Sequence, residues 1–174
     1  MKRWQCLDNV AAVSVADWQQ AGIRGILIDL DNTLVSEDDR WLSPGVEDWL
    51  RRSREAGLAL FLLSNGRRVQ RFQYWSQRLG VPGICRAQKP LPRGFRRAQA
   101  SLGLGPQALL VIGDSLHTDG LGAWLAGCVW IQVCSLPHPP RWWELWLGRW
   151  LHRPYPRPEE LIPLEPQNLT DLPS

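Results

Sequence analysis

A short apolar run that ends in two closely spaced aspartates constrains the fold of this chain more than any other part of its sequence. Residues 26–35 read ILIDLDNTLV, so Asp29 and Asp31 follow the β-forming run Gly25–Ile28. Such a run predicts a buried strand of a parallel sheet. Carboxylates directly after it lie at the carboxyl end of the strand, where open α/β sheets bind their ligands. Because two like charges this close repel each other, we expect a cation near them or an altered protonation equilibrium.

Strand and helix signals alternate along most of the chain. Helical spacing, capping residues and terminal glycines predict helices over 15–21, 44–56, 67–79, 92–102 and 119–126. Apolar runs predict strands over 25–30, 58–63, 84–87, 108–112 and 128–133. Alternating strands and helices favour right-handed βαβ units. We therefore expect an α/β, Rossmann-like, three-layer fold with a parallel sheet between helices.

Composition narrows the functional classes. The 174 residues, 44% of them apolar, are enough for one domain with a core, and the net charge of +3 is too mild to argue for nucleic acid. The four cysteines lie far apart and form no CxxC pair, which disfavours structural zinc and disulfides and indicates reduced thiols. The chain begins without a secretory signal and has no apolar run long enough to span a bilayer. We expect a cytoplasmic protein that can lie peripherally on the inner face of a membrane.

Side chains capable of chemistry follow four of the predicted strands. They form four clusters, at residues 29–33, 64–65, 89–90 and 113–119. Because the carboxyl ends of parallel strands meet at one edge of the sheet, we expect all four clusters to lie together.

The four clusters together have the residues needed for phosphoryl transfer. Asp29 can attack phosphorus as a carboxylate nucleophile. Asp31 can protonate the leaving oxygen and then activate a water molecule. Asp29, Asp114 and the backbone carbonyl of Asp31 are predicted to hold Mg²⁺, which prefers oxygen ligands. The metal and the Lys89 ammonium would then neutralise charge on the transferred group.

Other polar residues are expected to support this site. Ser64, with Asn65 and nearby backbone N–H groups, is predicted to hold phosphate oxygens. Capping of the following helix by Ser64 and a turn-forming role for Asn65 stay open as alternatives. Thr33 is expected to stand behind the reacting groups. Asp119 either positions Lys89 or a metal-bound water, or caps the helix that it begins.

The ordered motifs resemble those of haloacid dehalogenase (HAD) superfamily phosphatases. They are DLDNTLV from Asp29, Ser64-Asn65, Lys89-Pro90 and GDSLHTD from Gly113, and the resemblance runs from about residue 21 to residue 133. It implies a phospho-aspartate mechanism with Mg²⁺, and Asp31 in the second acidic position favours a phosphatase over a dehalogenase. The gaps between motifs leave room for a flap at 36–42 but not for a cap domain.

A closer resemblance is to the YqeG-like branch of HAD subfamily IIIA. The matching stretches are GIRGILIDLDNTLV at 22–35, AQKP at 87–90 and GDSLHTD at 113–119. Two positions depart from the branch: Ser115 stands where glutamine is usual, and Gly66 where asparagine is frequent. The branch is similar to mitochondrial and plastid phosphatidylglycerophosphate phosphatases, which implies a phospholipid substrate.

Past Ser135 the composition changes. Residues 141–152 hold four tryptophans, and Trp143, Trp146 and Trp150 share one face of a predicted amphipathic helix. Such a helix, rich in Trp and Arg, can contact a membrane surface, pack on its own domain or form an oligomer interface. After Arg153 we expect an irregular tail. The sequence thus predicts a phosphatase domain over 1–135 and a C-terminal helix and tail over 136–174.

The sequence favours one function and leaves two alternatives. The favoured one is Mg²⁺-dependent hydrolysis of a phosphomonoester. The resemblance, together with the predicted tryptophan-rich helix, implies that it converts phosphatidylglycerophosphate to phosphatidylglycerol. One alternative is a soluble phosphatase for a sugar phosphate or nucleotide, and the other is a HAD-like module that binds without turnover. Of the three histidines, His117 is expected to be a loop residue near the site, whereas His138 and His152 have no recognisable partners.

Overall fold

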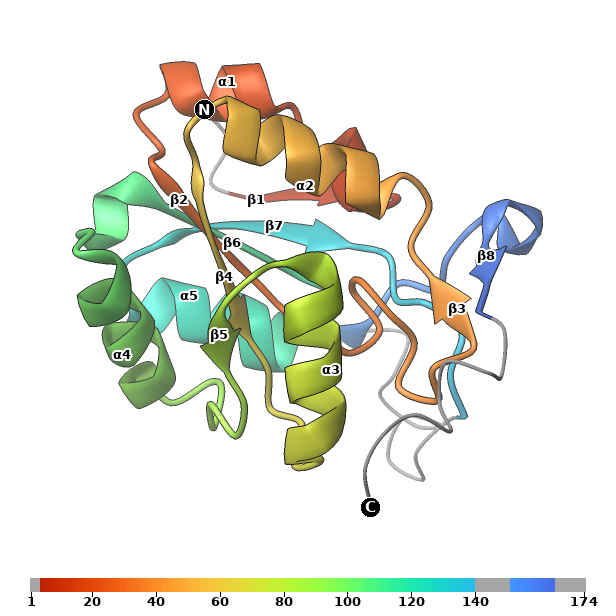
Figure 1. The fold of residues 1–174 in the computed structure, drawn as a ribbon. Coiled ribbons are helices and arrows are strands. Elements are labelled where there is room, and N and C mark those ends of the chain that lie inside the picture. The colour runs from red at the N-terminus through yellow and green to blue at the C-terminus, as the bar shows by residue number, and fades with distance from the viewer. Residues whose placement is uncertain (1–3, 140–150, 165–174) are drawn as a thin grey trace.

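The computed structural model describes residues 4–139 and 151–164 of the chain. A six-stranded parallel sheet lies at its centre, between helices (Figure 1), with the strand order β1-β7-β6-β2-β4-β5. The strands are β1 (Trp4–Leu7), β2 (Gly25–Ile28), β4 (Ala59–Leu63), β5 (Gly83–Ile84), β6 (Leu109–Gly113) and β7 (Val129–Val133). The longer helices are α1 (Val15–Gln20), α2 (Val46–Glu55), α3 (Val69–Leu79), α4 (Pro92–Leu102) and α5 (Leu121–Leu125). Short helical turns are η1 (Val10–Ala12), η2 (Pro106–Ala108), η3 (Leu116–Gly120) and η4 (Pro158–Glu160).

Successive side chains of the central strands point to opposite faces of the sheet and build two cores. In β2, Ile26 and Ile28 pack with buried residues of α1, α2 and α3, whereas Leu27 packs with Phe95 of α4 and Ala123 of α5. This period of two explains why an unbroken apolar run forms a strand here, since both faces are covered. The predicted three-layer α/β fold is confirmed.

Several predicted elements differ in their limits. Strand β1, which sequence reasoning missed, has only four residues and pairs with β7 at the sheet edge. Helix α2 begins two residues after Pro44, because Gly45 in the left-handed region (φ 67°) separates the proline from the helix. The predicted helix over 119–126 is divided: Asp119 belongs to η3, one π-helical turn, and α5 follows it.

The segment between β2 and α2 forms the predicted flap, and no cap domain is inserted among the described residues. The flap ends in the short strand β3 (Trp41–Leu42), which pairs antiparallel with β8 (Ile162–Pro163). The expectation of an irregular tail after Arg153 is therefore wrong for the part of the tail that the structure describes, residues 154–164. The Ser135 N–H also donates to the Arg153 carbonyl (2.6 Å), and Tyr155 N–H donates to the Ser135 carbonyl (3.0 Å). Backbone pairing that links distant segments leaves no local pattern from which to predict these strands.

Most of the predicted tryptophan-rich helix falls on residues 140–150, which lie outside the described residues. Among the described residues, none of the helices has the length and apolar character needed to cross a bilayer.

Candidate active site

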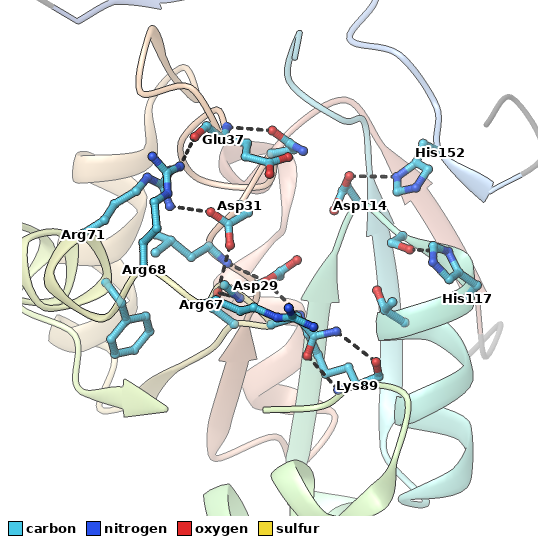
Figure 2. A pocket seen from close by; sticks show the side chains of 18 residues that line it. Asp29, Asp31, Glu37, Arg67, Arg68, Arg71, Lys89, Asp114, His117 and His152 are labelled. Atoms are coloured by element: carbon cyan, nitrogen blue, oxygen red, sulfur yellow. Dashed lines mark hydrogen bonds and ion pairs between the residues drawn. The ribbon is translucent and has the colours of Figure 1, made fainter. Parts of the chain in front are cut away.

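A pocket of about 450 Å³ opens at the carboxyl edge of the sheet. All four polar clusters predicted from the sequence contribute to its lining (Figure 2), including Asp29, Asp31, Ser64, Lys89 and Asp114. The parallel topology brings them together, since β2, β4 and β6 are hydrogen-bonded neighbours and their carboxyl ends share one edge.

Asp29 follows β2 and is only 9% exposed. Its Oδ1 atom accepts a hydrogen bond from the Leu30 N–H (2.8 Å) and lies 2.7 Å from Lys89 Nζ. No hydrogen bond within the described residues occupies its Oδ2 atom. Burial raises the pKa of Asp29 well above its ordinary value of 3.8, the carboxylates of Asp119 and Asp114 add to the rise, and Lys89 only partly opposes it.

Lys89 is buried and bridges two carboxylates. Its Nζ atom donates to Asp119 Oδ1 at 2.6 Å, opposite the contact with Asp29. Burial lowers the pKa of Lys89, but the charges of Asp119 and Asp29 outweigh that effect and hold the pKa above its ordinary value. Lys89 is therefore an ammonium, a compact charge fixed against the two acids.

Asn65 fixes the backbone of Lys89. Its Oδ1 accepts the Lys89 N–H (2.7 Å) and its Nδ2 donates to the Lys89 carbonyl (2.9 Å). Asn65 was predicted to hold a phosphate oxygen, and it does line the pocket. Its side-chain amide, however, is used by these two hydrogen bonds, which position the backbone of Lys89.

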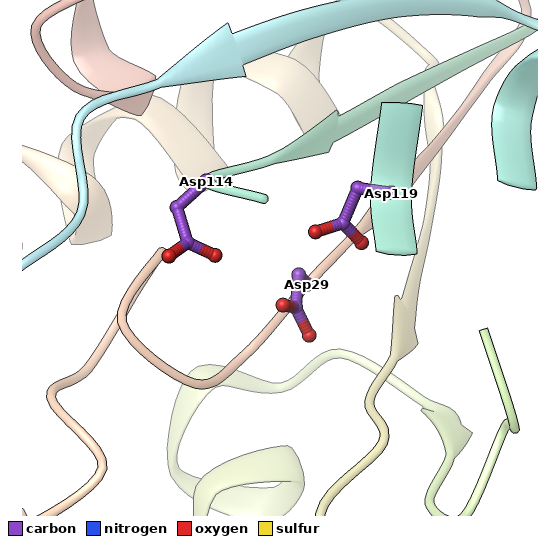
Figure 3. Close-up of side chains that lie close together, drawn as sticks. All are labelled: Asp29, Asp114 and Asp119. Atoms are coloured by element: carbon purple, nitrogen blue, oxygen red, sulfur yellow. The ribbon is translucent and has the colours of Figure 1, made fainter. Parts of the chain in front are cut away.

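Three buried carboxylates form a candidate metal centre (Figure 3). Asp29, Asp114 and Asp119 each offer an oxygen, and these three atoms lie within 4.8 Å of one another. The three carboxylates can only accept hydrogen bonds, they outnumber the one adjacent ammonium, and they are shielded from water. Such a group of oxygen ligands fits a hard divalent cation such as Mg²⁺. Burial is the main cause of the raised pKa of Asp29, and the charges of Asp119 and Asp114 add to it. The carboxylate of Asp31 is not part of this group, and its predicted contribution was the backbone carbonyl.

Asp114 and Asp119 are held by neighbouring side chains. Thr33 Oγ1 donates to Asp114 Oδ1 (3.3 Å) and accepts the Asp114 N–H (3.1 Å), so Thr33 stands behind the site as expected. Asp119 lies inside η3, and its Oδ2 accepts the Ser115 N–H (3.3 Å). Of the two roles left open for Asp119, its contacts fit the positioning of Lys89 rather than a helix cap.

Asp31 belongs to a second network. Ser64 Oγ donates to Asp31 Oδ2 (2.9 Å) and accepts the Gly66 N–H (2.9 Å), whereas the residue flanking the start of α3 is Arg68. Ser64 therefore does not cap that helix. Its hydroxyl group instead orients the predicted acid and base of the site.

Arg71 of α3 was not predicted, and it joins this second network to the flap. Its guanidinium forms an ion pair with Asp31, a second with Asp39 (Nε–Oδ1 2.8 Å), and donates to the Ser36 carbonyl (2.9 Å). Asp39 also accepts the Trp75 indole N–H (2.8 Å). The available sequence signal was the position of Arg71, four residues before Trp75 on the buried face of α3, where an arginine needs carboxylate partners.

His152 reaches the site from the C-terminal segment. The expectation that it has no partners is wrong: its Nδ1 lies 3.0 Å from Asp114 Oδ2. Burial raises the pKa of Asp114, but the hydrogen bond and charge of His152, together with the charge of Lys89, outweigh that effect and lower the pKa overall. Gln132 Nε2 donates to the carbonyls of both Asp114 (3.0 Å) and Leu151 (3.3 Å), which fixes the approach of this segment. His117, which was expected to be a loop residue near the site, lines the pocket but belongs to the helical turn η3.

Comparison with known proteins identifies the family. The family model described as haloacid dehalogenase-like hydrolase matches residues 37–127, more than half of the chain. The chain belongs to the haloacid dehalogenase-like hydrolases. The HAD resemblance carried by the sequence motifs is thereby confirmed.

Two relatives of this HAD-like hydrolase are named as phosphatases. The Bacillus subtilis protein named "Probable phosphatase YqeG" is 34% identical over 114 residues, which cover 66% of each chain. The Thermus thermophilus protein named "Phosphoserine phosphatase" is 35% identical over 109 residues, 57% of this chain and 44% of that protein. The chain thus matches just under two thirds of the first relative and less than half of the second.

Solved structures share the HAD fold at low identity. A HAD-superfamily hydrolase of subfamily IA from Geobacter sulfurreducens has a TM-score of 0.51 and 13% identity, with 69% of this chain and 90% of that chain covered. The cobalt-bound deoxy-D-mannose-octulosonate 8-phosphate phosphatase from Haemophilus influenzae has a TM-score of 0.50 and 14% identity, with 72% and 75% covered. These structures support the fold alone.

Proposed function

We propose that this protein is a Mg²⁺-dependent phosphomonoester hydrolase that works through a phospho-aspartate at Asp29. The observation that carries the proposal is the setting of the Asp29 carboxylate. One of its oxygens is fixed by Lys89 and the Leu30 N–H, beside two further buried carboxylates and at the base of a 450 Å³ pocket. With a divalent cation offsetting the carboxylates, a nucleophile held this way would face a site able to receive a negatively charged phosphoryl group.

The reaction proceeds in two displacements. Asp29 Oδ2 forms a bond to phosphorus while the bond from phosphorus to the ester oxygen breaks, and Asp31 gives that oxygen a proton. In the second step Asp31 takes a proton from water as the water oxygen bonds to phosphorus. The bond between phosphorus and Asp29 breaks, and inorganic phosphate leaves with both aspartates restored.

The residues present would hold Mg²⁺ through Asp29, Asp114 and the Asp31 carbonyl, with Asp119 close by. When bound, the cation neutralises charge on the phosphoryl group and on the acidic cluster. Lys89 contributes the second positive charge, since its ammonium touches the nucleophile. The proposed donors to phosphate oxygens are backbone N–H groups of the Ser64 loop. Ser64 itself would donate to phosphate only by turning its single hydroxyl proton away from Asp31.

Phosphatidylglycerophosphate is the proposed substrate, with phosphatidylglycerol as the product. The supports are the YqeG-like motifs, the similarity to the Bacillus subtilis protein and the apolar surface of α5. On that helix Trp124 is 72% exposed, and Leu121 and Leu125 are 42% and 48% exposed. Helix α5 follows η3, which begins two residues after Asp114, so these apolar side chains suit contact with a lipid surface.

Two other functions remain as alternatives. The Thermus thermophilus relative, named for a soluble phosphomonoester, favours a soluble substrate. A binding module without turnover has no need for Asp31, whose carboxylate is held by Ser64 and Arg71.

The decisive experiment measures phosphate release from phosphatidylglycerophosphate in mixed micelles, with Mg²⁺ and with EDTA, beside a panel of soluble phosphomonoesters. We expect Mg²⁺-dependent release from the lipid well above that from the panel. Release from soluble esters alone would leave the chemistry standing and contradict the lipid substrate.

The variant Asp29→Asn tests the proposed nucleophile. It is expected to lose turnover by about a thousandfold or more, because the amide cannot form the covalent intermediate. The matched control is Asp48→Asn on α2, where the carboxylate side chain is 55% exposed and should not affect turnover. Full activity in Asp29→Asn would overturn the mechanism.

A further inference from the structure

A second hollow adjoins the active-site pocket. Its volume is about 530 Å³, and its lining residues are Asn65, Arg67, Arg86 and Gln88. Asn65 and Arg67 also line the active-site pocket, as Asp29 and Lys89 do (Figure 2). The two spaces are therefore neighbours that share a wall.

Two loops fastened to each other form this hollow. The Arg86 N–H donates to the Gly66 carbonyl (3.2 Å), and the Ala87 N–H donates to the Ser64 carbonyl (2.9 Å). Arg86 Nη2 also approaches the Arg67 carbonyl at 3.4 Å. The loop that presents Arg86 thus leans on the loop that supplies Ser64.

The backbone of this loop is strained. Arg86 and Gln88 adopt φ values of 52° and 61°, in the left-handed region that side chains other than glycine and asparagine rarely enter. Strain of this kind persists only where the surrounding structure enforces it, and it clusters at functional sites. Here it lies within the three residues before Lys89.

The hollow carries positive charge without a compensating acid. Arg67 and Arg86 are the charged residues of its lining, both are exposed, and neither forms a salt bridge within the described part of the chain. By contrast, Arg51 and Arg71 each pair with two carboxylates. Guanidinium groups offer forked donors that match the oxygens of phosphate and carboxylate groups.

We propose that this arginine pocket binds a second anionic group of the substrate. It defines the substrate class as phosphomonoesters that also carry a phosphodiester, phosphate or carboxylate. The inference rests on the proposed function and extends it to substrate selection. A lipid headgroup and a free metabolite both supply this chemistry, and the experiment separates them.

The test compares kcat/KM within two matched pairs of phosphomonoesters. Phosphoserine is compared with phosphoethanolamine, which lacks the carboxylate, and glycerophosphoglycerophosphate with glycerol 3-phosphate, which lacks the phosphodiester. In the wild-type protein the doubly anionic member of at least one pair should be preferred by about tenfold or more. Acylated phosphatidylglycerophosphate in micelles is run beside its deacylated form, and a preference for the acylated form assigns the anion to a lipid headgroup.

Arg86→Gly is the diagnostic variant, because glycine adopts the left-handed backbone without strain. The preference within the pair should fall about tenfold, and Arg86→Lys should keep part of it. A ratio of two substrates is unaffected by any fraction of misfolded protein. Arg24→Ala is the matched control, since Arg24 is exposed at the opposite, amino end of β2 and should leave the ratio unchanged.

The outcomes separate the two proposals. Turnover without a preference in either pair, or a preference that survives Arg86→Gly, overturns the arginine pocket and leaves the phosphatase in place. No turnover of any phosphomonoester overturns the proposed function, and the inference falls with it.

Discussion

Two buried cations, Lys89 and Arg71, divide the aspartates of the first motif between them. Lys89 bridges Asp29 to Asp119, and Arg71 bridges Asp31 to Asp39. Each cation is 5% exposed. Lys89 joins Asp29 to an acid from a distant segment, whereas Arg71 joins Asp31 to an acid of the adjoining flap. Two carboxylates that would repel each other across one intervening residue are thereby assigned to separate networks.

The two bridges differ in their surroundings. Lys89 lies beside the acidic cluster, where a compact ammonium can approach a transferred phosphoryl group. Arg71 uses its fork to hold two carboxylates and the Ser36 carbonyl of the flap at once. The lysine is thus suited to charge neutralisation during the reaction, and the arginine to fixing the geometry of Asp31.

Of the two buried cations, the lysine should cause the larger loss of activity when it is removed. Lys89→Met is expected to lower kcat by about a thousandfold, because the variant loses the cation that touches the nucleophile. Unfolding free energy should also fall, by about 3–5 kcal/mol, since Asp29 and Asp119 stay buried without their partner. Steady-state kinetics and urea denaturation measure the two losses. A variant with near-normal kcat would show that Lys89 has only a structural role.

Removing the arginine should lower kcat less than removing the lysine does. Arg71→Met is expected to lower kcat about a hundredfold, because Asp31 loses the partner that fixes its position. Asp39→Asn sharpens the comparison, since it weakens the anchor to the flap and leaves the ion pair between Arg71 and Asp31 in place. Its kcat should fall less than that of Arg71→Met. Arg78→Met, exposed on the same helix, is the control, and equal losses in the control and Arg71→Met would contradict the assignment.

Removing the side chains that hydrogen-bond to Asp114 should weaken metal affinity more than it lowers kcat measured at saturating metal. His152→Ala and Thr33→Val are each expected to weaken Mg²⁺ or Mn²⁺ binding about tenfold, because Asp114 loses a hydrogen bond that orients it. Thr33→Ser, which keeps the hydroxyl group, should bind almost as the wild type does. Isothermal titration calorimetry with the metal alone measures the change. Unaltered affinity in both disruptive variants would remove these residues from the metal site.

The smallest effect is expected in how the melting temperature of the metal-free protein depends on pH. Burial, with Asp119 and Asp114, raises the pKa of Asp29 in the folded state, so the folded state binds this proton more tightly than the unfolded state does. The resulting stability is fully present below the unfolded value of 3.8 and is lost as pH rises through the higher folded value. In EDTA the melting temperature should therefore increase as pH is lowered from neutral toward 5, and Asp29→Asn should flatten this trend. A wild-type profile that falls over this range would contradict it.

The sequence predicted the parts of the site that lie within short motifs. Asp29 and Asp114 each follow a strand whose apolar run is visible in the chain, and parallel topology then requires that they meet. Lys89 was predicted from its motif, since the strand before it, β5, is only Gly83–Ile84 and not the predicted 84–87. The central strands were predicted for the same reason, because residues buried on both faces leave an unbroken apolar run.

Elements that depend on distant partners were missed. Arg71 is one of 18 arginines and is distinguished only by its place on the buried face of α3. His152 lies 38 residues from Asp114, and no local pattern links the two. Strands β3 and β8 have two residues each and exist because they pair with each other. Tertiary contact, rather than local preference, determines all of these features.

The pairing of β3 with β8 has a consequence for shortened forms of this protein. Edge strands with unpaired N–H and C=O groups invite self-association with other chains. In this fold the Leu164 N–H donates to the Arg40 carbonyl (2.8 Å), and Ile162 lies opposite Leu42, so the outer edge of the flap is covered by the chain itself. A version cut after residue 135 would keep all strands of the six-stranded sheet and every motif aspartate, yet it would lose β8, expose that edge and become prone to aggregation.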